Sequence, residues 1–244
     1  MKEFLADLHI HTALSPCAVD EMTPPAIVRA ALAQGLAMIA VCDHNSAGNV
    51  AAVQQAAGPA LAAIAGIEIT TAEEVHVVGL FPDAASAEGA AAEVLATLPV
   101  RRGRSAGLGM QLLMDAQGNV RGSEKRMLAS ASALALGDAV GLVHRFGGLA
   151  IAAHVDRPSF SVLSQLGVFP AEAGFDGAEI SAFSRGSPRA AEFEAWGLPL
   201  VASSDSHSPG EIGCAWSVLS ARAATFEELG RAMRGEGGRR ISHA

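Results

Sequence analysis

The chain has 244 residues, of which 50% are hydrophobic, and its 25 acidic and 17 basic residues give a net charge of -8. This length and composition suffice for one large α/β domain or two small ones, and we expect a single domain over residues 1–244. The negative charge and the lack of a Lys/Arg run argue against tight electrostatic binding to duplex nucleic acid. A short, locally bound nucleotide is still allowed.

The N-terminal segment and the cysteines bear on the location of the protein. The N-terminus enters a strand-like segment without a basic region, a long apolar stretch or a small-residue cleavage site, so no signal peptide is expected. No apolar run approaches the ~18 to 20 residues of a membrane span. Cys17, Cys42 and Cys214 are odd in number and far apart, which favours reduced thiols and a cytoplasmic location.

Short β-like runs alternate along the chain with Ala-rich helical stretches, a pattern typical of parallel strands joined by helical crossovers. Strands are predicted at Glu3–Leu8, Ala37–Val41, Ala60–Ala65, Val75–Phe81, Leu149–Ala153, Gly177–Ile180, Leu198–Ala202 and Ala215–Leu219. Helices are predicted at Pro24–Gln34, Ala47–Ala57, Ser86–Leu98, Gly137–Phe146, Ser161–Leu166, Pro188–Trp196 and Thr225–Arg234. About seven strand–helix units indicate an α/β protein with an irregular (β/α)7 TIM-like barrel.

The alternation breaks near residues 99–136, which we interpret as an inserted subdomain. The insertion opens with Arg101-Arg102-Gly103-Arg104, and the segment from Gln111 to Asn119 is predicted to be a strand that enters a turn. Two interpretations stay open for this segment. It is either a partly mobile surface insertion, or a cap over one barrel face that selects the substrate.

Histidines and acids recur at the ends of the predicted strands, where an α/β barrel presents its catalytic face. They are His9, His11, His44, Glu68, His154, Asp205 and His207. His9 and His11 stand at positions i and i+2, so their side chains point to the same side and can bind one ion together. Such a ring of side chains predicts a multinuclear metal site.

The mixture of ligand types indicates the metals and the reaction. Imidazole together with carboxylate suits Zn, Mn or Fe better than Ca, which takes oxygen ligands only. The two oxygens of Glu68 can bridge neighbouring ions. Closely spaced ions can activate a bridging hydroxide, neutralise a phosphate and stabilise the leaving oxygen. The residues therefore predict metal-dependent hydrolysis of a phosphate ester.

The order of these motifs resembles that of the PHP superfamily, named for polymerase and histidinol phosphatase. The matching motifs run through essentially the whole chain as His9-Ile10-His11, Asp43-His44, Glu68, His76, His154 and Asp205-Ser206-His207. The resemblance implies an irregular seven-stranded barrel that holds three metal ions. A lone His-x-His would be a weak signal, whereas four ordered motifs make a chance match improbable.

The resemblance also implies which residues share an ion. One shell would contain His9, His11, Glu68 and Asp205, a second Glu68 with His76 and His154, and a third His44 with His207. The third shell departs from the family pattern. Its missing ligand is either Asp20, which we favour because an oxygen donor suits Mn, or the thiolate of Cys17, which would favour Zn or Fe. If neither reaches, the third ion is expected to be weakly bound or missing.

Several of these residues have a plainer interpretation. His76, within a predicted strand, could be a half-buried strand histidine, and His144 and His243 are expected to be ordinary. Asp7 and Asp43 abut ligands, so they either orient imidazoles or serve as packing or capping residues.

Phosphate binding requires fixed positive charge near the metals. Arg157 and Arg185 are the best candidates, because guanidinium can hold phosphate oxygens in a bidentate fork. The alternative for each is a surface or ion-paired arginine. A P-loop is excluded, because the sequence contains no Gly-x4-Gly-Lys pattern.

We therefore expect a phosphoesterase that acts on a nucleoside monophosphate, a 3',5'-bisphosphate or a short oligonucleotide. One alternative is a phosphatase of histidinol phosphate or another small metabolite. A second is a non-catalytic metal-binding module that supports a partner protein. A third is an amidohydrolase, but that family typically carries a bridging carboxylated lysine, and Lys2 and Lys125 are badly placed for it. The oligomeric state and the native metal are left open.

Overall fold

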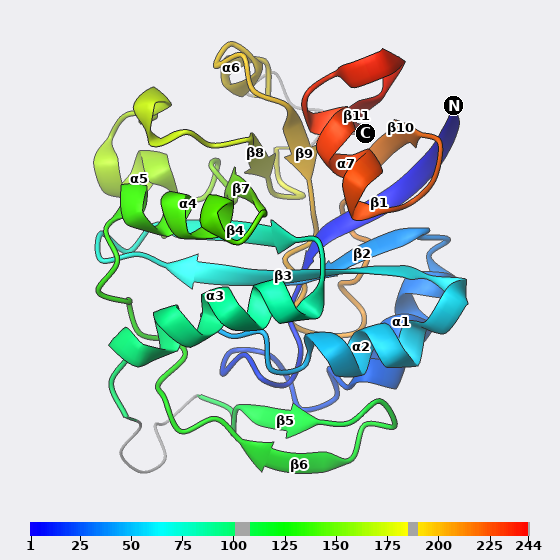
Figure 1. Ribbon diagram of the computed structural model, residues 1–244, viewed down its shortest axis with the longest axis vertical. Helices are drawn as coiled ribbons and strands as arrows, with labels where there is room; N and C mark the ends of the chain where they lie inside the picture. Colours follow the sequence, from blue (N-terminus) through cyan, green and yellow to red (C-terminus); the bar gives the residue numbers. More distant parts are fainter. Residues whose placement is uncertain (101–107, 185–189, 244) are drawn as a thin grey trace.

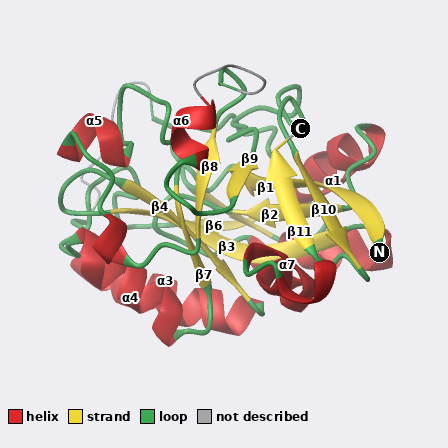
Figure 2. Cartoon of the chain, turned by 90° about the horizontal axis from the view of Figure 1, so that it is seen from above, coloured by secondary structure: helices red, strands yellow, loops and turns green. Residues whose placement is uncertain are grey.

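The apolar runs of the sequence lie side by side in one nine-stranded sheet. Its strands are β1 (Lys2–Ile10), β2 (Met38–Val41), β3 (Ala62–Thr70), β4 (His76–Phe81), β7 (Leu149–Ala152), β8 (Gly177–Ile180), β9 (Leu200–Ala202), β10 (Ser217–Ala221) and β11 (Arg240–His243). Their order is β11-β10-β1-β2-β3-β4-β7-β8-β9. Because β11 lies against β9, the sheet nearly closes into a distorted TIM-like barrel (Figure 2). The computed structural model describes residues 1–100, 108–184 and 190–243.

Helices surround this barrel (Figures 1 and 2). In the described part of the chain they are α1 (Pro24–Ala33), α2 (Val50–Ala57), α3 (Ala84–Thr97), α4 (Leu136–Arg145), α5 (Val162–Leu166), α6 (Ala190–Glu194) and α7 (Phe226–Met233). The first begins as its sequence predicts, since Thr23 accepts a hydrogen bond from the Ala26 amide ahead of two prolines. None of these helices is long and apolar enough to cross a membrane.

The expectation of parallel strands throughout was wrong. β3 pairs antiparallel with β4, β4 antiparallel with β7, and β1 antiparallel with β10. Only five residues separate β3 from β4, which is too few for the crossover connection that parallel neighbours need. The fold class itself, an irregular α/β TIM-like barrel, is confirmed.

Antiparallel pairing also lengthens β3 beyond its predicted end. The strand continues to Thr70, which pairs with His76, so Glu68 lies inside the strand rather than beyond it. Gly66 allows this tight arrangement. A Cβ at that position would lie 2.9 Å from the Val41 carbonyl oxygen and 3.1 Å from the Gly79 carbonyl oxygen. Glycine thus lets three strands approach closely beside the site.

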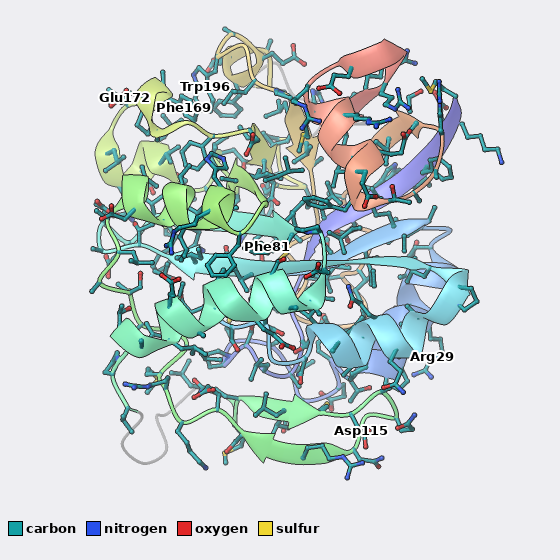
Figure 3. All side chains as sticks on the ribbon, viewed as in Figure 1. Arg29, Phe81, Asp115, Phe169, Glu172 and Trp196 are labelled. Atoms are coloured by element: carbon teal, nitrogen blue, oxygen red, sulfur yellow. The ribbon has the colours of Figure 1, made fainter. Side chains whose placement is uncertain are left out.

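Alternate residues of the strands face two cores. In β2, Met38 and Ala40 face the barrel interior, whereas Ile39 and Val41 pack under the helices. Phe81, at the end of β4, is fully buried beneath α3 and α4 (Figure 3). The helical layer therefore provides one core and the barrel interior the other.

The segment 99–136 contains a separate two-stranded sheet of β5 (Leu112–Met114) and β6 (Val120–Ser123). The predicted strand and turn from Gln111 to Asn119 correspond to β5 and the turn after it, while β6 was not predicted. Leu128 packs with Leu14 and Leu98 in a small core of their own. Figure 1 shows this hairpin at one end of the molecule, beyond α2 and α3.

A charged pair fastens the end of the barrel sheet to α7. Arg239 donates from Nε and Nη2 to the two carboxylate oxygens of Glu228, at 2.8 Å each, and the Arg222 amide donates to the same carboxylate. The hydrogen bonds from Arg239 and Arg222 lower the pKa of Glu228 from 4.5 to about 2.

We expect Glu228→Gln to lower the melting temperature at pH 7. A carboxylate with a depressed pKa stabilises the fold above its unfolded pKa, and this contribution disappears as the pH falls from about 4.5 to about 2. Thermal unfolding of wild type and variant across this range should therefore show a converging difference. Glu192→Gln, at an exposed position on α6, is the control. A difference that stayed constant with pH would contradict this assignment.

Candidate metal centre

The predicted ligands gather at one end of the barrel. His9 lies near the end of β1, Glu68 near the end of β3 and His76 at the start of β4, while His154 and Asp205 follow β7 and β9. The antiparallel direction of β4 explains why a residue at its start joins residues at the ends of the other strands.

Glu68 is the centre of this cluster and is fully buried. Five imidazoles approach its carboxylate, with ring nitrogens 2.7 to 3.5 Å from Oε1 or Oε2, and they belong to His9, His11, His44, His76 and His154. On one side of this carboxylate, His11 Nε2 also lies 3.2 Å from His9 Nε2 and 2.9 Å from Asp205 Oδ1.

Three sets of these side chains have donor atoms close enough to hold one ion each. They are His9, His11, Glu68 and Asp205; His44, Glu68 and His76; and His11, His44 and His207. The first set has the composition inferred for the first shell. The second set differs from the second shell inferred from the sequence, because it contains His44 in place of His154. His154 lies beside this set, with Nε2 3.2 Å from Glu68 Oε1 and 3.3 Å from His76 Nδ1.

Unpaired buried atoms support the fit of this cluster to metal ions. His44 Nδ1 lies 2.8 Å from Glu68 Oε2, yet neither atom has a hydrogen bond of good geometry among the described residues. His154 Nδ1 is likewise buried without a partner there. A buried polar atom without a hydrogen bond is costly, and coordination to a cation would remove that cost.

The electrostatics of the cluster depend on its own charges. Burial raises the pKa of Glu68, but the neighbouring imidazoles of His76, His9 and His44 outweigh it and hold that pKa well below the ordinary value. Burial lowers the pKa of His9, but the charges of Glu179, Asp205 and Glu68 hold it well above the ordinary value. Carboxylates therefore stay ionised in this site and available to cations.

Glu179 is a site residue that the sequence analysis missed. Both of its carboxylate oxygens lie 3.1 Å from His9 Nδ1, and the His154 amide donates to Oε1. This contact fixes the His9 ring so that Nε2 faces Glu68. A signal existed in the sequence, because Gly177-Ala178-Glu179-Ile180 repeats the pattern Gly66-Ile67-Glu68-Ile69 at another strand end.

We expect Glu179→Gln to weaken metal binding and metal-dependent turnover about 10- to 100-fold, the range typical for a residue that orients a metal-binding histidine. Titration of the metal-free protein with Mn²⁺ or Zn²⁺ measures the first quantity. Glu172→Gln, on the exposed surface, is the matched control and should change neither (Figure 3). Unchanged affinity in Glu179→Gln would show that the carboxylate has no part in positioning His9.

The two aspartates beside the ligands serve different purposes. Asp43 accepts hydrogen bonds from the Thr12 amide and hydroxyl and from Ser15 Oγ, which lies 2.8 Å from His11 Nδ1. It therefore acts on His11 through Ser15. Asp7 accepts from the Ser204 and Gly213 amides and so anchors the loop that carries Asp205 and His207.

Asp20 and Cys17, the two candidates for the remaining ligand of the third site, differ in their contacts with the histidines. Asp20 and Cys17 are both exposed, and neither belongs to the metal-compatible sets found among the described residues. Cys17 Sγ lies 3.1 Å from His44 Nε2. Burial raises the pKa of the Cys17 thiol, but hydrogen bonds with His207 and His44 outweigh it and lower that pKa to about 6.

One of the two predicted phosphate-binding arginines lies beside the cluster. Arg157 Nη1 donates to Asp205 Oδ2, and its side chain stays 31% exposed. Arg185 falls outside the described residues. His144 and His243 lie away from the cluster and pair with Asp176 and Glu194.

Backbone conformation marks the same region. His154, Asp205 and Asn45 have φ values of 27°, 49° and 53°, in the left-handed region that residues other than glycine seldom adopt. Asn45 holds its turn through hydrogen bonds from its Nδ2 to the Leu128 and Ser130 carbonyls. Strained conformations of this kind persist where the surrounding structure fixes them.

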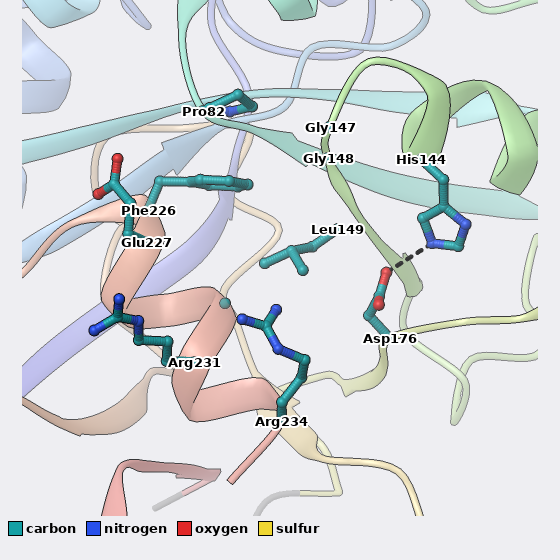
Figure 4. A pocket seen from close by; sticks show the side chains of 11 residues that line it. Pro82, His144, Gly147, Gly148, Leu149, Asp176, Phe226, Glu227, Arg231 and Arg234 are labelled. Carbon is teal, nitrogen blue, oxygen red and sulfur yellow. Dashed lines mark hydrogen bonds and ion pairs between the residues drawn. The ribbon is translucent and has the colours of Figure 1, made fainter. Parts of the chain in front are cut away.

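A separate cavity of about 530 Å³ lies away from the cluster, between α7 and the starts of β7 and β8 (Figure 4). Most of its charged side chains are already paired. Arg234 contacts Glu236, Arg231 contacts Glu228, and His144 donates to Asp176. Three of the four buried side-chain atoms without a hydrogen bond among the described residues belong to the histidine cluster, so we assign the chemistry to that cluster.

Several solved structures share the fold of this chain. The lesion-specific endonuclease PfuEndoQ from Pyrococcus furiosus is 21% identical over 98% of this chain and 58% of its own, with a TM-score of 0.77. Endonuclease Q in complex with a 27-mer duplex bearing an abasic lesion is 19% identical over the same shares, with a TM-score of 0.74. A proposed metal-dependent phosphoesterase from Bifidobacterium adolescentis is 20% identical over 84% of this chain and 88% of its own, with a TM-score of 0.57.

A family model described as PHP-associated matches residues 189–236. This match is confined to the C-terminal part of the chain. The buried cluster of His, Glu and Asp contains sites suited to several divalent ions. No curated protein matches the chain. The chain spans 58% of the endonuclease Q chains, so the likeness to them establishes the fold and not their activity.

Proposed function

We propose that this chain is a metal-dependent phosphoesterase of the PHP superfamily and that it hydrolyses a phosphate ester of a nucleotide, which is a nucleoside monophosphate, a 3',5'-bisphosphate or a short oligonucleotide. The observation that carries the proposal is the convergence of five imidazoles on the Glu68 carboxylate, with Arg157 at the edge of the same cluster. Two or three divalent ions, Mn, Zn or Fe, would be held there. When bound, they would activate water as the nucleophile and neutralise the phosphate.

The protein itself would orient and hold the substrate. Most side chains of the cluster are nearly inaccessible, with exposures up to 11% at His44, whereas Arg157 and His207 are 31% and 27% exposed. The phosphate would therefore enter on the side of these two residues. Arg157 would hold phosphate oxygens with the guanidinium N–H groups that Asp205 does not use.

The distribution of charge favours a polyanionic substrate. Although the chain carries a net charge of -8, residues 99–136 contain six Lys/Arg and only two acidic residues. Within the described part of this insertion, Arg121 and Lys125 are exposed. The net charge of the whole chain therefore does not exclude contact with duplex DNA, which is bound by one of the similar enzymes. Local basic surface is the property that matters for phosphate contacts.

The insertion lies beside the loops of the metal centre, and we propose that it acts as a cap of the single domain. The Leu112 amide donates to the Ala13 carbonyl, and Asn49 bonds the Leu112 carbonyl and the Met114 amide. These contacts join β5 to the segments that follow β1 and β2, which carry His11 and His44.

Phosphate release by the metal-free protein, reconstituted with Mn²⁺, Zn²⁺ or Fe²⁺, tests the proposal. The panel contains nucleoside monophosphates, 3',5'-bisphosphates, short single strands, a duplex and histidinol phosphate, with His9→Ala as the control. We expect metal-dependent turnover of a nucleotide that His9→Ala loses. Preference for histidinol phosphate would overturn the substrate class. No turnover of any ester by fully metallated protein would overturn the function.

We further propose that Cys17, rather than Asp20, completes the third metal site. His207 Nδ1 lies 2.8 Å from the Asp205 carbonyl oxygen. Nε2 is therefore the ring nitrogen that can bind an ion. That imidazole and His44 both contact the Cys17 thiol. Two imidazoles and a thiolate suit Zn or Fe, and thiol coordination releases a proton.

We expect Co²⁺ binding to the wild-type protein to produce a thiolate-to-metal charge-transfer absorption band that Cys17→Ser lacks. The variant should also bind one ion fewer, or bind it at least about tenfold more weakly. Cys214→Ser, at an exposed cysteine, should keep the band. If Asp20→Asn lost the third ion while Cys17→Ser kept it, the oxygen donor would be the ligand.

A further inference from the structure

Phe160 lies at the rim of the metal centre with a side chain that is 40% exposed. One face of its ring stacks on His76, with centroids 4.6 Å apart and an angle of 16° between the planes. His76 Nδ1 in turn lies 2.7 Å from Glu68. Only one imidazole therefore separates this phenyl ring from the carboxylate at the centre of the cluster.

The backbone holds Phe160 in this position. Its φ of 57° is in the left-handed region, which a bulky aromatic residue rarely adopts. Its carbonyl accepts a hydrogen bond from the His76 amide, and the next residue, Ser161, bonds the Arg157 carbonyl and caps α5. Neighbouring contacts thus fix the unusual conformation and keep the ring at the rim instead of in the core.

The same loop carries the arginine proposed to bind phosphate. Arg157 reaches Asp205, in the set with His9 and His11, while Phe160 reaches His76, in the set with His44. A single short segment therefore places a cation beside one set of metal-compatible side chains and an aromatic ring beside another. This pairing matches the two parts of a nucleotide, an anionic phosphate and a flat base.

We infer that Phe160 is a stacking platform for the nucleobase of the substrate. The inference rests on the proposed phosphoesterase function and narrows its substrate to esters that carry a base. Stacking on an aromatic ring is tolerant of base identity, because every base has a π-face. The structure therefore assigns to Phe160 a general preference for nucleotides over phosphate esters without a base, and no preference among the four bases.

Adenosine 5'-monophosphate and ribose 5-phosphate separate the base from the rest of the substrate, because they differ only in the base. We expect the metal-loaded wild type to bind the nucleotide more tightly by about 5- to 150-fold in calorimetric titration, the range that stacking of one base supplies. Phe160→Ala and Phe160→Leu should reduce this ratio to near one while affinity for ribose 5-phosphate stays unchanged. Phe160→Tyr should preserve the ratio.

The controls separate base binding from support of the metal centre. Phe160→Leu keeps an apolar cover over His76, and metal content is measured for each variant. Phe183→Ala removes a ring that is 89% exposed and stacks on none of the described histidines, so it should leave the ratio unchanged. Equal weakening of both ligands in Phe160→Ala, an equal affinity of wild type for both, or binding of neither would overturn the inference. Turnover of a phosphate ester without a base, together with equal affinities for adenosine 5'-monophosphate and ribose 5-phosphate, would overturn the inference and leave the phosphoesterase function intact.

Discussion

Glu68→Gln is expected to reduce metal-dependent phosphate release by at least about 10³-fold. Metal ions supply several kcal/mol of transition-state stabilisation, and each loss of about 1.4 kcal/mol lowers the rate tenfold. Glu68 contributes to two of the three metal-compatible sets, and its oxygens face ring nitrogens of five histidines. Glutamine keeps the volume of the side chain but is neutral, and it replaces one carboxylate oxygen with an NH2 group that cannot bind a cation.

The assay compares kcat of wild type and Glu68→Gln at saturating metal, together with the number of bound ions per chain. Glu88→Gln, on the exposed face of α3, removes a carboxylate of the same size far from the strand ends and should leave both quantities unchanged. Retention of wild-type kcat in Glu68→Gln would show that the two ions do not share this carboxylate in turnover.

The sequence predicts the fold through its strand–helix alternation, but it misleads about strand direction. Helices are predicted on either side of the β3–β4 pair and none between its strands, and this missing helix is the sign of an antiparallel hairpin. The end of β3 is likewise not predictable from the local sequence, because Glu68 and Thr70 are held in the strand by pairing with β4. Pairing partners distant in sequence decide both features.

The site is predictable where a ligand sits in a distinctive motif. His9 and His11 in His-x-His, and Asp205 in Asp-x-His, are brought together as the motifs suggest. The sharing of ligands between ions is harder to predict, since His44 joins Glu68 and His76 in space although Glu68 lies 24 positions after it in the sequence. Whether an acid such as Glu179 binds a cation or a ligand histidine depends on side-chain direction, which spacing alone does not define.

The loop after β1 shows a different limit. Cys17 and Asp20 are three residues apart in a segment without regular structure, and either could have faced the histidines. Hydrogen bonds of Ser15 with Asp43 and of the Ala18 amide with the Ser15 carbonyl set the path of this loop. These contacts bring the thiol within 3.1 Å of His44 Nε2, and they depend on the tertiary structure of the neighbouring strand.

Metal binding is expected to stabilise the fold substantially. A ligand that binds only the folded state at a concentration 100 times its Kd contributes about 2.7 kcal/mol, which corresponds to a rise in Tm of about 5 to 11 °C for a chain of this size. Thermal unfolding of chelator-treated protein with and without Mn²⁺ or Zn²⁺ measures this rise. In Glu68→Gln the rise should be much smaller, because two of the ligand sets lose their shared carboxylate.

The stabilisation should also increase with pH. The charges of neighbouring carboxylates hold the pKa of His9 well above its ordinary value, and the charge of Glu68 does the same for His44, although burial opposes both shifts. These imidazoles therefore retain protons at neutral pH, and a metal ion must displace them. We expect a larger rise in Tm at pH 8 than at pH 6. An equal rise in Glu68→Gln and wild type, or one independent of pH, would show that the stabilising ion binds outside this cluster.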